Sequence, residues 1–212
     1  MYSLEGQIAI ITGGARGIGK GICEVFCKAG ATVALWDVLD EGTQTADQIE
    51  KDGGSIFFQK VDITNKSSVE EAVSKIISAH GKIDILINNA GVIRDRSFMK
   101  MSEEEWNTVI NINLTGMFIV TKAVFPIMKE AGYGRIISAS SINAFQGAFG
   151  QANYSATKAG ISGFTRALCK EGGKYGITVN AVAPGFIKSL MSDSMPEEII
   201  KAGIAQIPVG RI

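Results

Sequence analysis

The sequence has 212 residues, in which 21 Lys and Arg balance 21 Asp and Glu, and 46% of the residues are apolar. This length accommodates one α/β domain with a sizeable core, which we expect to span residues 1–212. The composition is typical of an ordered globular protein. Because the chain has neither a basic excess nor a cationic amphipathic stretch, we expect no nucleic-acid partner and no membrane partner.

Cysteine and histidine usage argues against disulfide and metal chemistry. The three cysteines form no CxxC pair and have no His nearby, so we expect ordinary buried thiols in a reducing compartment. Residues 1–6 contain no basic region and no apolar run, so no signal peptide is predicted and the cytoplasm is the expected location. The single histidine, His80, stands at a predicted helix end, and no His/Cys/Asp cluster indicates a metal site.

Short β-branched runs alternate with helical stretches along the chain. Strands are predicted over residues 7–12, 32–36, 55–60, 83–87, 135–139 and 177–182. Helices are predicted over roughly 17–29, from the end of the second strand to about residue 52, and from an Asn65 cap to residues 80–81. Two more are predicted, one that begins at a capping box at 102–105 and one over 151–170. This alternation implies parallel strands joined by right-handed crossovers, and therefore a doubly wound, Rossmann-like α/β fold.

A glycine-rich turn, Thr-Gly-Gly-Ala-Arg-Gly-Ile-Gly, joins the first predicted strand to the first helix. Gly13 permits a tight turn, Gly17 lets the backbone approach a pyrophosphate, and Gly19 brings the helix close to the sheet. The helix N-terminus offers free N–H groups to an anion. Such turns also occur for purely structural reasons, but the position in a βαβ unit favours a dinucleotide site that includes Arg16 and Ile18.

Asp37 ends the second predicted strand. An acidic side chain at this place can accept the two ribose hydroxyls of NAD and repel the additional phosphate of NADP. Arg16 has the opposite effect, because a guanidinium in the loop can pair with that phosphate. We predict NAD(H) as the preferred cofactor and leave NADP(H) open.

Three motifs occur in order: the glycine-rich turn, then Asn88-Asn89-Ala90-Gly91, then Tyr154-x-x-x-Lys158. Together they resemble the short-chain dehydrogenase/reductase family, and the resemblance covers nearly the whole chain. Within that family, residues 91–95, 134–137 and 150–154 are most similar to the 3-oxoacyl-thioester reductases.

The resemblance implies a catalytic set that elementary chemistry supports. Tyr154 and Lys158 are four residues apart on a predicted helix and therefore share one face. An ammonium beside a phenol lowers the pKa of the phenol, so Tyr154 can act as the acid in reduction and the base in oxidation. The resemblance further implies that Lys158 holds the nicotinamide ribose, that Ser141 binds the substrate oxygen, and that Asn113 holds a water that relays protons to Lys158.

Further cofactor contacts are implied by the resemblance alone. They are Asp62 and Ile63 at the adenine, Asn89 and Gly91 beneath the cofactor, and Pro184, Gly185 and Ile187 at the nicotinamide carboxamide. Ser189 stands where the family usually has Thr, a change that keeps the hydroxyl.

Two features depart from the family pattern. Members that use an acyl carrier protein have basic residues where this chain has Gly132 and Tyr175, while Lys129 and Lys174 lie close but displaced. A CoA thioester or a free hydroxy compound therefore remains open as the substrate. The sequence ends at residue 212, where family members continue with a helix and an edge strand. Either it is a piece of a longer chain, which we favour, or the sheet of this protein ends one strand early.

These observations predict an NAD(H)-dependent oxidoreductase that moves a hydride between nicotinamide and a carbonyl or secondary alcohol. The favoured substrate is a 3-oxoacyl thioester, and the alternative is a free secondary alcohol such as a sugar or cyclic alcohol. A non-catalytic nucleotide-sensing module is less favoured, because it has no need of the phenol–ammonium pair. A homo-oligomer, a tetramer by resemblance, is expected because the helices over 102–129 and 151–170 are too apolar for solvated faces.

Overall fold

The computed structural model describes residues 3–187 and 197–211. Its strands are β1 (Ile8–Thr12), β2 (Thr32–Asp37), β3 (Ser55–Lys60), β4 (Ile85–Asn88), β5 (Gly134–Ala139) and β6 (Ile177–Val182). Its α-helices are α1 (Gly17–Lys28), α2 (Glu41–Lys51), α3 (Lys66–His80), α4 (Glu103–Ile110), α5 (Met117–Ala131), α6 (Asn143–Gln146), α7 (Ala152–Gly172) and α9 (Glu197–Ala205). Short 3₁₀ turns at Phe98–Lys100 and Gly173–Tyr175 and a π-helical turn at Asn111–Gly116 complete the described elements.

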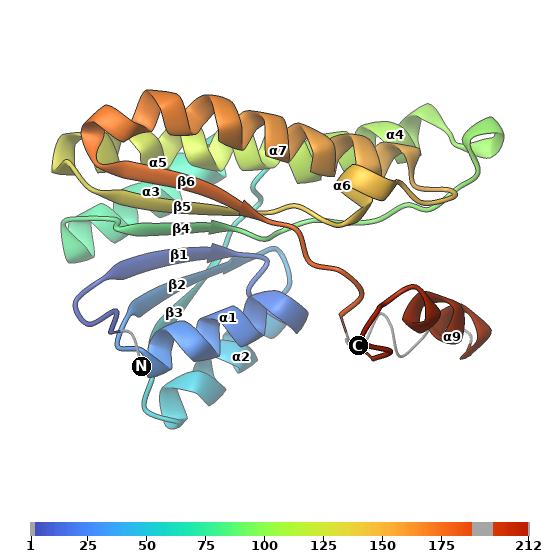
Figure 1. Ribbon diagram of the computed structural model, residues 1–212. Coiled ribbons are helices and arrows are strands. Elements are labelled where there is room, and N and C mark those ends of the chain that lie inside the picture. Colours follow the sequence, from blue (N-terminus) through green and yellow to red (C-terminus); the bar gives the residue numbers. More distant parts are fainter. Residues whose placement is uncertain (1–2, 188–196, 212) are drawn as a thin grey trace.

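All six strands are parallel and lie in the order β3-β2-β1-β4-β5-β6. Helices α1 and α2 cover one face of the sheet, and α3, α5 and α7 cover the other (Figure 1). The predicted doubly wound fold is confirmed. Because the chain starts in the middle of the sheet and winds both ways, the strand order reverses between β1 and β4, and ligands bind in such folds outside the carboxyl ends of the strands at this point.

Apolar runs form the central strands because both faces of the sheet are covered. Every residue of β1 and β4 is buried. The predicted helix signals are also confirmed: the Asn65 side chain accepts from the Ser68 N–H at 3.2 Å, and Ser102 and Glu105 form a reciprocal capping box. Short α6 and the π-helical turn were not predicted, since neither has a distinct periodicity.

One helical stretch, Glu103–Ala131, is long and apolar enough to cross a membrane by length and composition alone. The core helix of a soluble protein meets the same criteria, so length and composition do not distinguish a buried helix from a membrane-spanning one. Three residues of its second half, Val120, Val124 and Met128, are fully buried in the core cluster against the sheet. The apolar face of this stretch is therefore used in packing within the molecule.

Candidate active site

The loop after β1 is fixed by hydrogen bonds from both neighbouring strands. The N–H groups of Gly13 and Gly14 donate to the Trp36 carbonyl at 2.8 and 3.2 Å. From the other side, Asn89 Nδ2 donates to the carbonyls of Thr12 and Gly13 at 3.0 and 3.1 Å. Asn89, predicted to lie beneath a cofactor, thus connects the ends of β1 and β4 and holds the glycine-rich turn in place.

The geometry of this loop fits a dinucleotide. A Cβ on Gly19 would overlap the Gly13 carbonyl oxygen, so α1 approaches the loop as closely as the motif requires. Gly17 has φ +57°, and a Cβ there would meet nothing within 4 Å, which leaves open space beside the backbone. The N-terminus of α1 has no side-chain cap at Arg16 and no acidic residue in its first turn. Its free N–H groups are suited to a pyrophosphate.

Asp37 lies at the carboxyl end of β2, where the sequence predicted it. Its Oδ2 accepts from the Ala15 N–H at 3.1 Å, and its Oδ1 accepts from the Leu39 N–H at 3.1 Å. Each carboxylate oxygen has a second lone pair for a ligand hydroxyl. The carboxylate is therefore held against the glycine-rich loop, while the side chain of Arg16 is exposed to solvent.

Other residues predicted at the cofactor lie in several environments. Asp62 is exposed, and its Oδ1 accepts from the N–H and hydroxyl of Thr64. The Ile63 side chain is 7% exposed and belongs to the core, so only its backbone is available to a ligand. The positions of Ile18, Gly91, Gly185 and Ile187 are exposed, and the Pro184 carbonyl accepts from Ile142 N–H at 3.0 Å. Ser189 lies outside the described residues.

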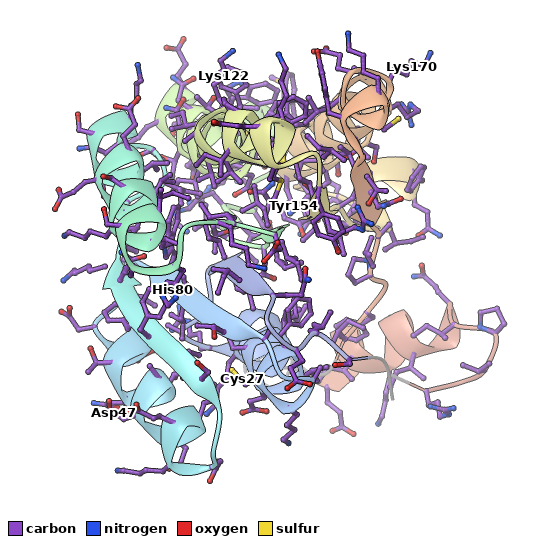
Figure 2. The ribbon with its side chains drawn as sticks, turned by 90° about the vertical axis from the view of Figure 1, so that its left-hand side faces the viewer. Cys27, Asp47, His80, Lys122, Tyr154 and Lys170 are labelled. Atoms are coloured by element: carbon purple, nitrogen blue, oxygen red, sulfur yellow. The ribbon has the colours of Figure 1, made fainter. Side chains whose placement is uncertain are left out.

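Three predicted catalytic side chains meet beyond the end of β5. Ser141 is buried at the start of the segment that follows this strand, and its side chain is a near enough neighbour of the Tyr154 phenol to lower the pKa of that group. Lys158 lies one turn further along α7, with Nζ 5.4 Å from the centroid of the Tyr154 ring. The predicted shared face is therefore confirmed. In Figure 2, Tyr154 lies near the centre of the view, apart from Lys122 and Lys170 at its upper edge.

The pKa of Tyr154 is raised above its ordinary value, chiefly because burial disfavours the phenolate. The neighbouring Ser141 hydroxyl acts in the opposite direction, and the negative charge of Asp95 raises the pKa further. The prediction that Lys158 lowers the pKa of Tyr154 is wrong. The ammonium lies over the ring and donates to the Ala139 carbonyl at 2.7 Å, so its charge is directed at the end of β5 and not at the phenol oxygen.

Lys158 is itself strongly perturbed. Its side chain is 4% exposed, and burial lowers the pKa of its ammonium from 10.5 to about 8. The Ser140 hydroxyl donates to the Lys158 carbonyl at 2.9 Å, which gives α7 a second contact with the segment after β5. Such a strongly shifted titratable group beside other polar side chains is typical of a functional site.

Asn113 lies in the π-helical turn between α4 and α5 and is 1% exposed. Its side-chain amide makes two hydrogen bonds with the backbone of Val92: Oδ1 accepts from the Val92 N–H at 2.8 Å, and Nδ2 donates to the Val92 carbonyl at 2.9 Å. Nδ2 also lies 3.4 Å from the Thr157 hydroxyl. The side chain thus joins the segment after β4 to α7, and π-turns of this kind are frequent at functional sites.

Three polar side chains beside the site were not predicted from the sequence. Gln151 Nε2 donates to Asp95 Oδ2 at 2.9 Å, and Gln151 Oε1 accepts from Asn143 Nδ2 at 2.8 Å. The Asn143 N–H donates to Ser141 Oγ at 3.2 Å. Asp95 and Gln151 are 56 positions apart, so no local spacing in the sequence signals this contact.

In residues 3–187 and 197–211, no group of three or more His, Cys, Asp or Glu side chains is arranged to hold a metal ion. Cys23, Cys27 and Cys169 are free thiols, and burial raises the pKa of Cys23 to about 12.

A dinucleotide-binding loop and a Tyr–Lys–Ser cluster at one sheet edge define the class of nicotinamide-dependent oxidoreductases. The sequence profile of the short chain dehydrogenase family matches residues 7–199. The chain belongs to the short-chain dehydrogenase family. It is an oxidoreductase that acts on CH–OH and C=O groups.

Individual relatives extend over nearly all of the chain. Over 211 residues it is 42% identical to an acetoacetyl-CoA reductase of Acinetobacter sp. (strain RA3849), covering 98% of this chain and 85% of that protein. It is 40% identical over 211 residues to the 3-oxoacyl-[acyl-carrier-protein] reductase FabG of Escherichia coli (strain K12), covering 99% and 85%. The crystal structure of gox2181 has a TM-score of 0.95 and 32% identity, covering 99% of this chain and 84% of that one.

The burial of Lys158 predicts that this residue limits stability. Replacing it by Met removes a buried ammonium and fills the same volume, so Lys158→Met should raise the free energy of unfolding by about 1–3 kcal/mol at pH 7. Between the folded pKa of about 8 and the ordinary value of 10.5, the unfolded chain binds more protons, so wild-type stability increases with pH. The advantage of the variant should therefore be complete below pH 8 and decrease toward pH 10.5.

Urea denaturation across this pH range measures the effect. Lys170→Met is the matched control, because Lys170 is an exposed residue of the same helix and its replacement should change stability by less than about 0.5 kcal/mol. A Lys158→Met protein that is less stable than wild type at pH 7 would show that the hydrogen bond to Ala139 outweighs the desolvation of the ammonium.

Proposed function

We propose that the chain is an NADH-dependent reductase of 3-oxoacyl thioesters. The observation that carries the proposal is the placement of Ser141 and Tyr154 as neighbours beyond the end of β5, with Lys158 one turn further along α7. This pair presents two hydroxyl donors in one place, which is what a carbonyl oxygen needs as it becomes an alkoxide. A nucleotide-sensing module stabilises no alkoxide, so it has no need of the two hydroxyls or of the buried Lys158.

Each residue has a distinct part in the proposed reaction. When bound, the reduced nicotinamide supplies the hydride that the carbonyl carbon accepts. Ser141 donates a hydrogen bond to the carbonyl oxygen, and Tyr154 gives its phenolic proton to the same oxygen, so the product is the secondary alcohol. Lys158, one turn further along α7, would hold the ribose. The raised pKa of Tyr154 supports this direction, since the phenol must be protonated to act as the acid.

The substrate class rests on the relatives together with the site. Two proteins with about two fifths of their residues identical to this chain are named as an acetoacetyl-CoA reductase and a 3-oxoacyl-[acyl-carrier-protein] reductase. Both names describe the same reacting group, a ketone beside a thioester. Lys129 and Lys174 lie 4.7 and 5.0 Å from the ring of Tyr175, so their charges are partly engaged there. We therefore propose a CoA thioester ahead of a carrier-protein thioester.

Asp37 supports NADH as the reduced cofactor. The ribose hydroxyls of NADH would find a fixed acceptor on this carboxylate, whereas a 2′-phosphate would meet its negative charge. Asn113 and Asn89 would support the site by holding the segment after β4. Proposed contacts at the adenine are Asp62 and the backbone of Ile63, and those at the nicotinamide are Pro184, Gly185 and Ile187.

We also propose a cytoplasmic location and a homo-oligomer. The free thiols fit a reducing compartment. Trp106 on α4 is 37% exposed and Phe118 on α5 is 49% exposed, on the stretch whose opposite side packs in the core. Burial of such side chains against another copy is favourable.

A substrate screen tests the proposed function. Oxidation of NADH by the purified protein should proceed with acetoacetyl-CoA at a kcat/KM about 100-fold above that with small ketones, because binding of the CoA portion contributes to the transition state. Ethyl acetoacetate is the matched control, since it keeps the 3-oxo group and lacks the CoA. A cyclic or sugar ketone that matches acetoacetyl-CoA would favour the free-alcohol alternative, and the absence of NADH oxidation with every carbonyl would support the nucleotide-sensing module.

The cofactor preference predicts a second outcome. Asp37→Asn keeps the size of the side chain and removes its charge, so NADPH use should rise about tenfold while the loop contacts are disturbed little. The measurement is kcat/KM for both cofactors in wild type and variant. A wild-type protein that already prefers NADPH by tenfold or more, about 1.4 kcal/mol, contradicts the argument from Asp37.

A further inference from the structure

The side chain of Asp95 starts a chain of hydrogen bonds that leads into the site. Its Oδ2 accepts from Gln151 Nε2 at 2.9 Å, and Gln151 Oε1 accepts from Asn143 Nδ2 at 2.8 Å. The backbone N–H of Asn143 then donates to Ser141 Oγ at 3.2 Å. These hydrogen bonds therefore connect the segment after β4 with α6 and end on the Ser141 hydroxyl, a neighbour of Tyr154.

The Asp95 carboxylate determines which groups donate and which accept in these hydrogen bonds. An ionised carboxylate can only accept, so the amide of Gln151 must turn its NH₂ group toward Asp95 and its oxygen toward Asn143. The Asn143 amide is fixed in turn, and with it the first turn of α6. The Asn143 N–H occupies one lone pair of Ser141 Oγ and so fixes where this oxygen lies, while the hydroxyl proton stays available to a substrate oxygen.

We propose that Asp95 is a positioning residue for carbonyl reduction: through Gln151 and Asn143 its carboxylate fixes the backbone N–H that holds the Ser141 hydroxyl oxygen in place. The inference rests on the proposed roles of Ser141 and Tyr154. It adds to them a residue on a different segment that acts on the site from outside the Ser–Tyr–Lys set.

The two segments do not depend on this chain for their contact. The Arg96 N–H donates to the Gly150 carbonyl at 2.8 Å, and Asn153 Nδ2 donates to the Arg94 carbonyl at 3.1 Å. Neither bond uses the side chain of Asp95 or Gln151. A variant that loses only the Asp95 charge should therefore keep the segments together, which separates positioning from a general structural role.

The charge of Asp95 also acts directly on Tyr154. Asp95 raises the pKa of Tyr154, while Lys158 lies over the ring from the same helix as Tyr154. The neighbouring cations are otherwise engaged: Arg96 pairs with Glu105 of α4 at 2.9 Å, and Arg94 donates to the Ile93 carbonyl at 2.8 Å. Asp95 forms no ion pair with the residues that the structure describes, so its charge is not neutralised by them.

Asp95→Asn tests both effects. Loss of the carboxylate should lower kcat about tenfold with a change in KM below about threefold, because the proton donors are misdirected while substrate binding is kept. Loss of the negative charge should shift the Tyr154-dependent limb of the pH profile downward by about half a pH unit. A purely structural role would change stability without moving this limb.

Gln151→Met provides the second variant. It interrupts the chain of hydrogen bonds but leaves the Asp95 charge, so kcat should fall as in Asp95→Asn without a downward shift of the pH limb. Asp52→Asn is the matched control, since Asp52 accepts from Gln48 Nε2 at 3.2 Å in a similar amide–carboxylate pair on α2. Its kcat and pH profile should equal those of wild type.

The outcomes distinguish this inference from the proposed function. If the limb is absent in Tyr154→Phe and kcat falls about tenfold in both Asp95→Asn and Gln151→Met, the inference is supported. If the limb is absent in Tyr154→Phe but either Asp95→Asn or Gln151→Met keeps the wild-type kcat, the inference is overturned while the proposed function stands. If the limb persists in Tyr154→Phe, the proposed role of Tyr154 fails first.

Discussion

The hydrogen bond from the buried Lys158 ammonium to the Ala139 carbonyl is the contact on which the arrangement of the site depends. At 2.7 Å it joins α7 to the carboxyl end of β5. Ser141 follows β5 by two positions, and Tyr154 precedes Lys158 by one helical turn, so this contact, with the bond from Ser140 to the Lys158 carbonyl, helps to hold both hydroxyls near each other. The glycine-rich loop reaches the same edge because β1 and β4 are neighbours in the sheet.

This contact has a cost in stability. The Lys158 side chain is only 4% exposed, and burial lowers the pKa of its ammonium to about 8. The surroundings therefore disfavour the charged form. Functional sites commonly keep such unfavourable groups because the chemistry requires them. Around Lys158, the protein compensates with buried polar contacts, among them the bonds of Ser140 to the Lys158 carbonyl and of Asn113 to Val92.

The sequence predicted those features that local patterns determine. All six strands, the Asn65 cap and the capping box at Ser102 follow from periodicity and short-range polar contacts, and each is confirmed. The meeting of Ser141 with Tyr154 was predicted from the family resemblance. The pKa of Tyr154 was predicted in the wrong direction, because desolvation depends on tertiary burial and cannot be obtained from the four-residue spacing.

The parts that the sequence did not predict are contacts between distant segments. The pairing of Asp95 with Gln151, the π-helical turn that carries Asn113 and the placement of α6 all depend on how the segment after β4 packs against α7. Polar side chains in loops give no periodic signal, so their partners emerge only from the three-dimensional arrangement. These contacts nevertheless surround the same hydroxyl pair that the motifs identified.

Single-turnover reduction of acetoacetyl-CoA by Tyr154→Phe tests the central claim most directly. The variant lacks only the phenolic hydroxyl and should keep the fold and NADH affinity of wild type. The account predicts that the rate of hydride transfer falls by about two to four orders of magnitude, the usual range for the loss of a positioned acid. A variant with unchanged NADH binding that retains more than about a tenth of the wild-type rate would contradict the assignment of Tyr154 as the proton donor.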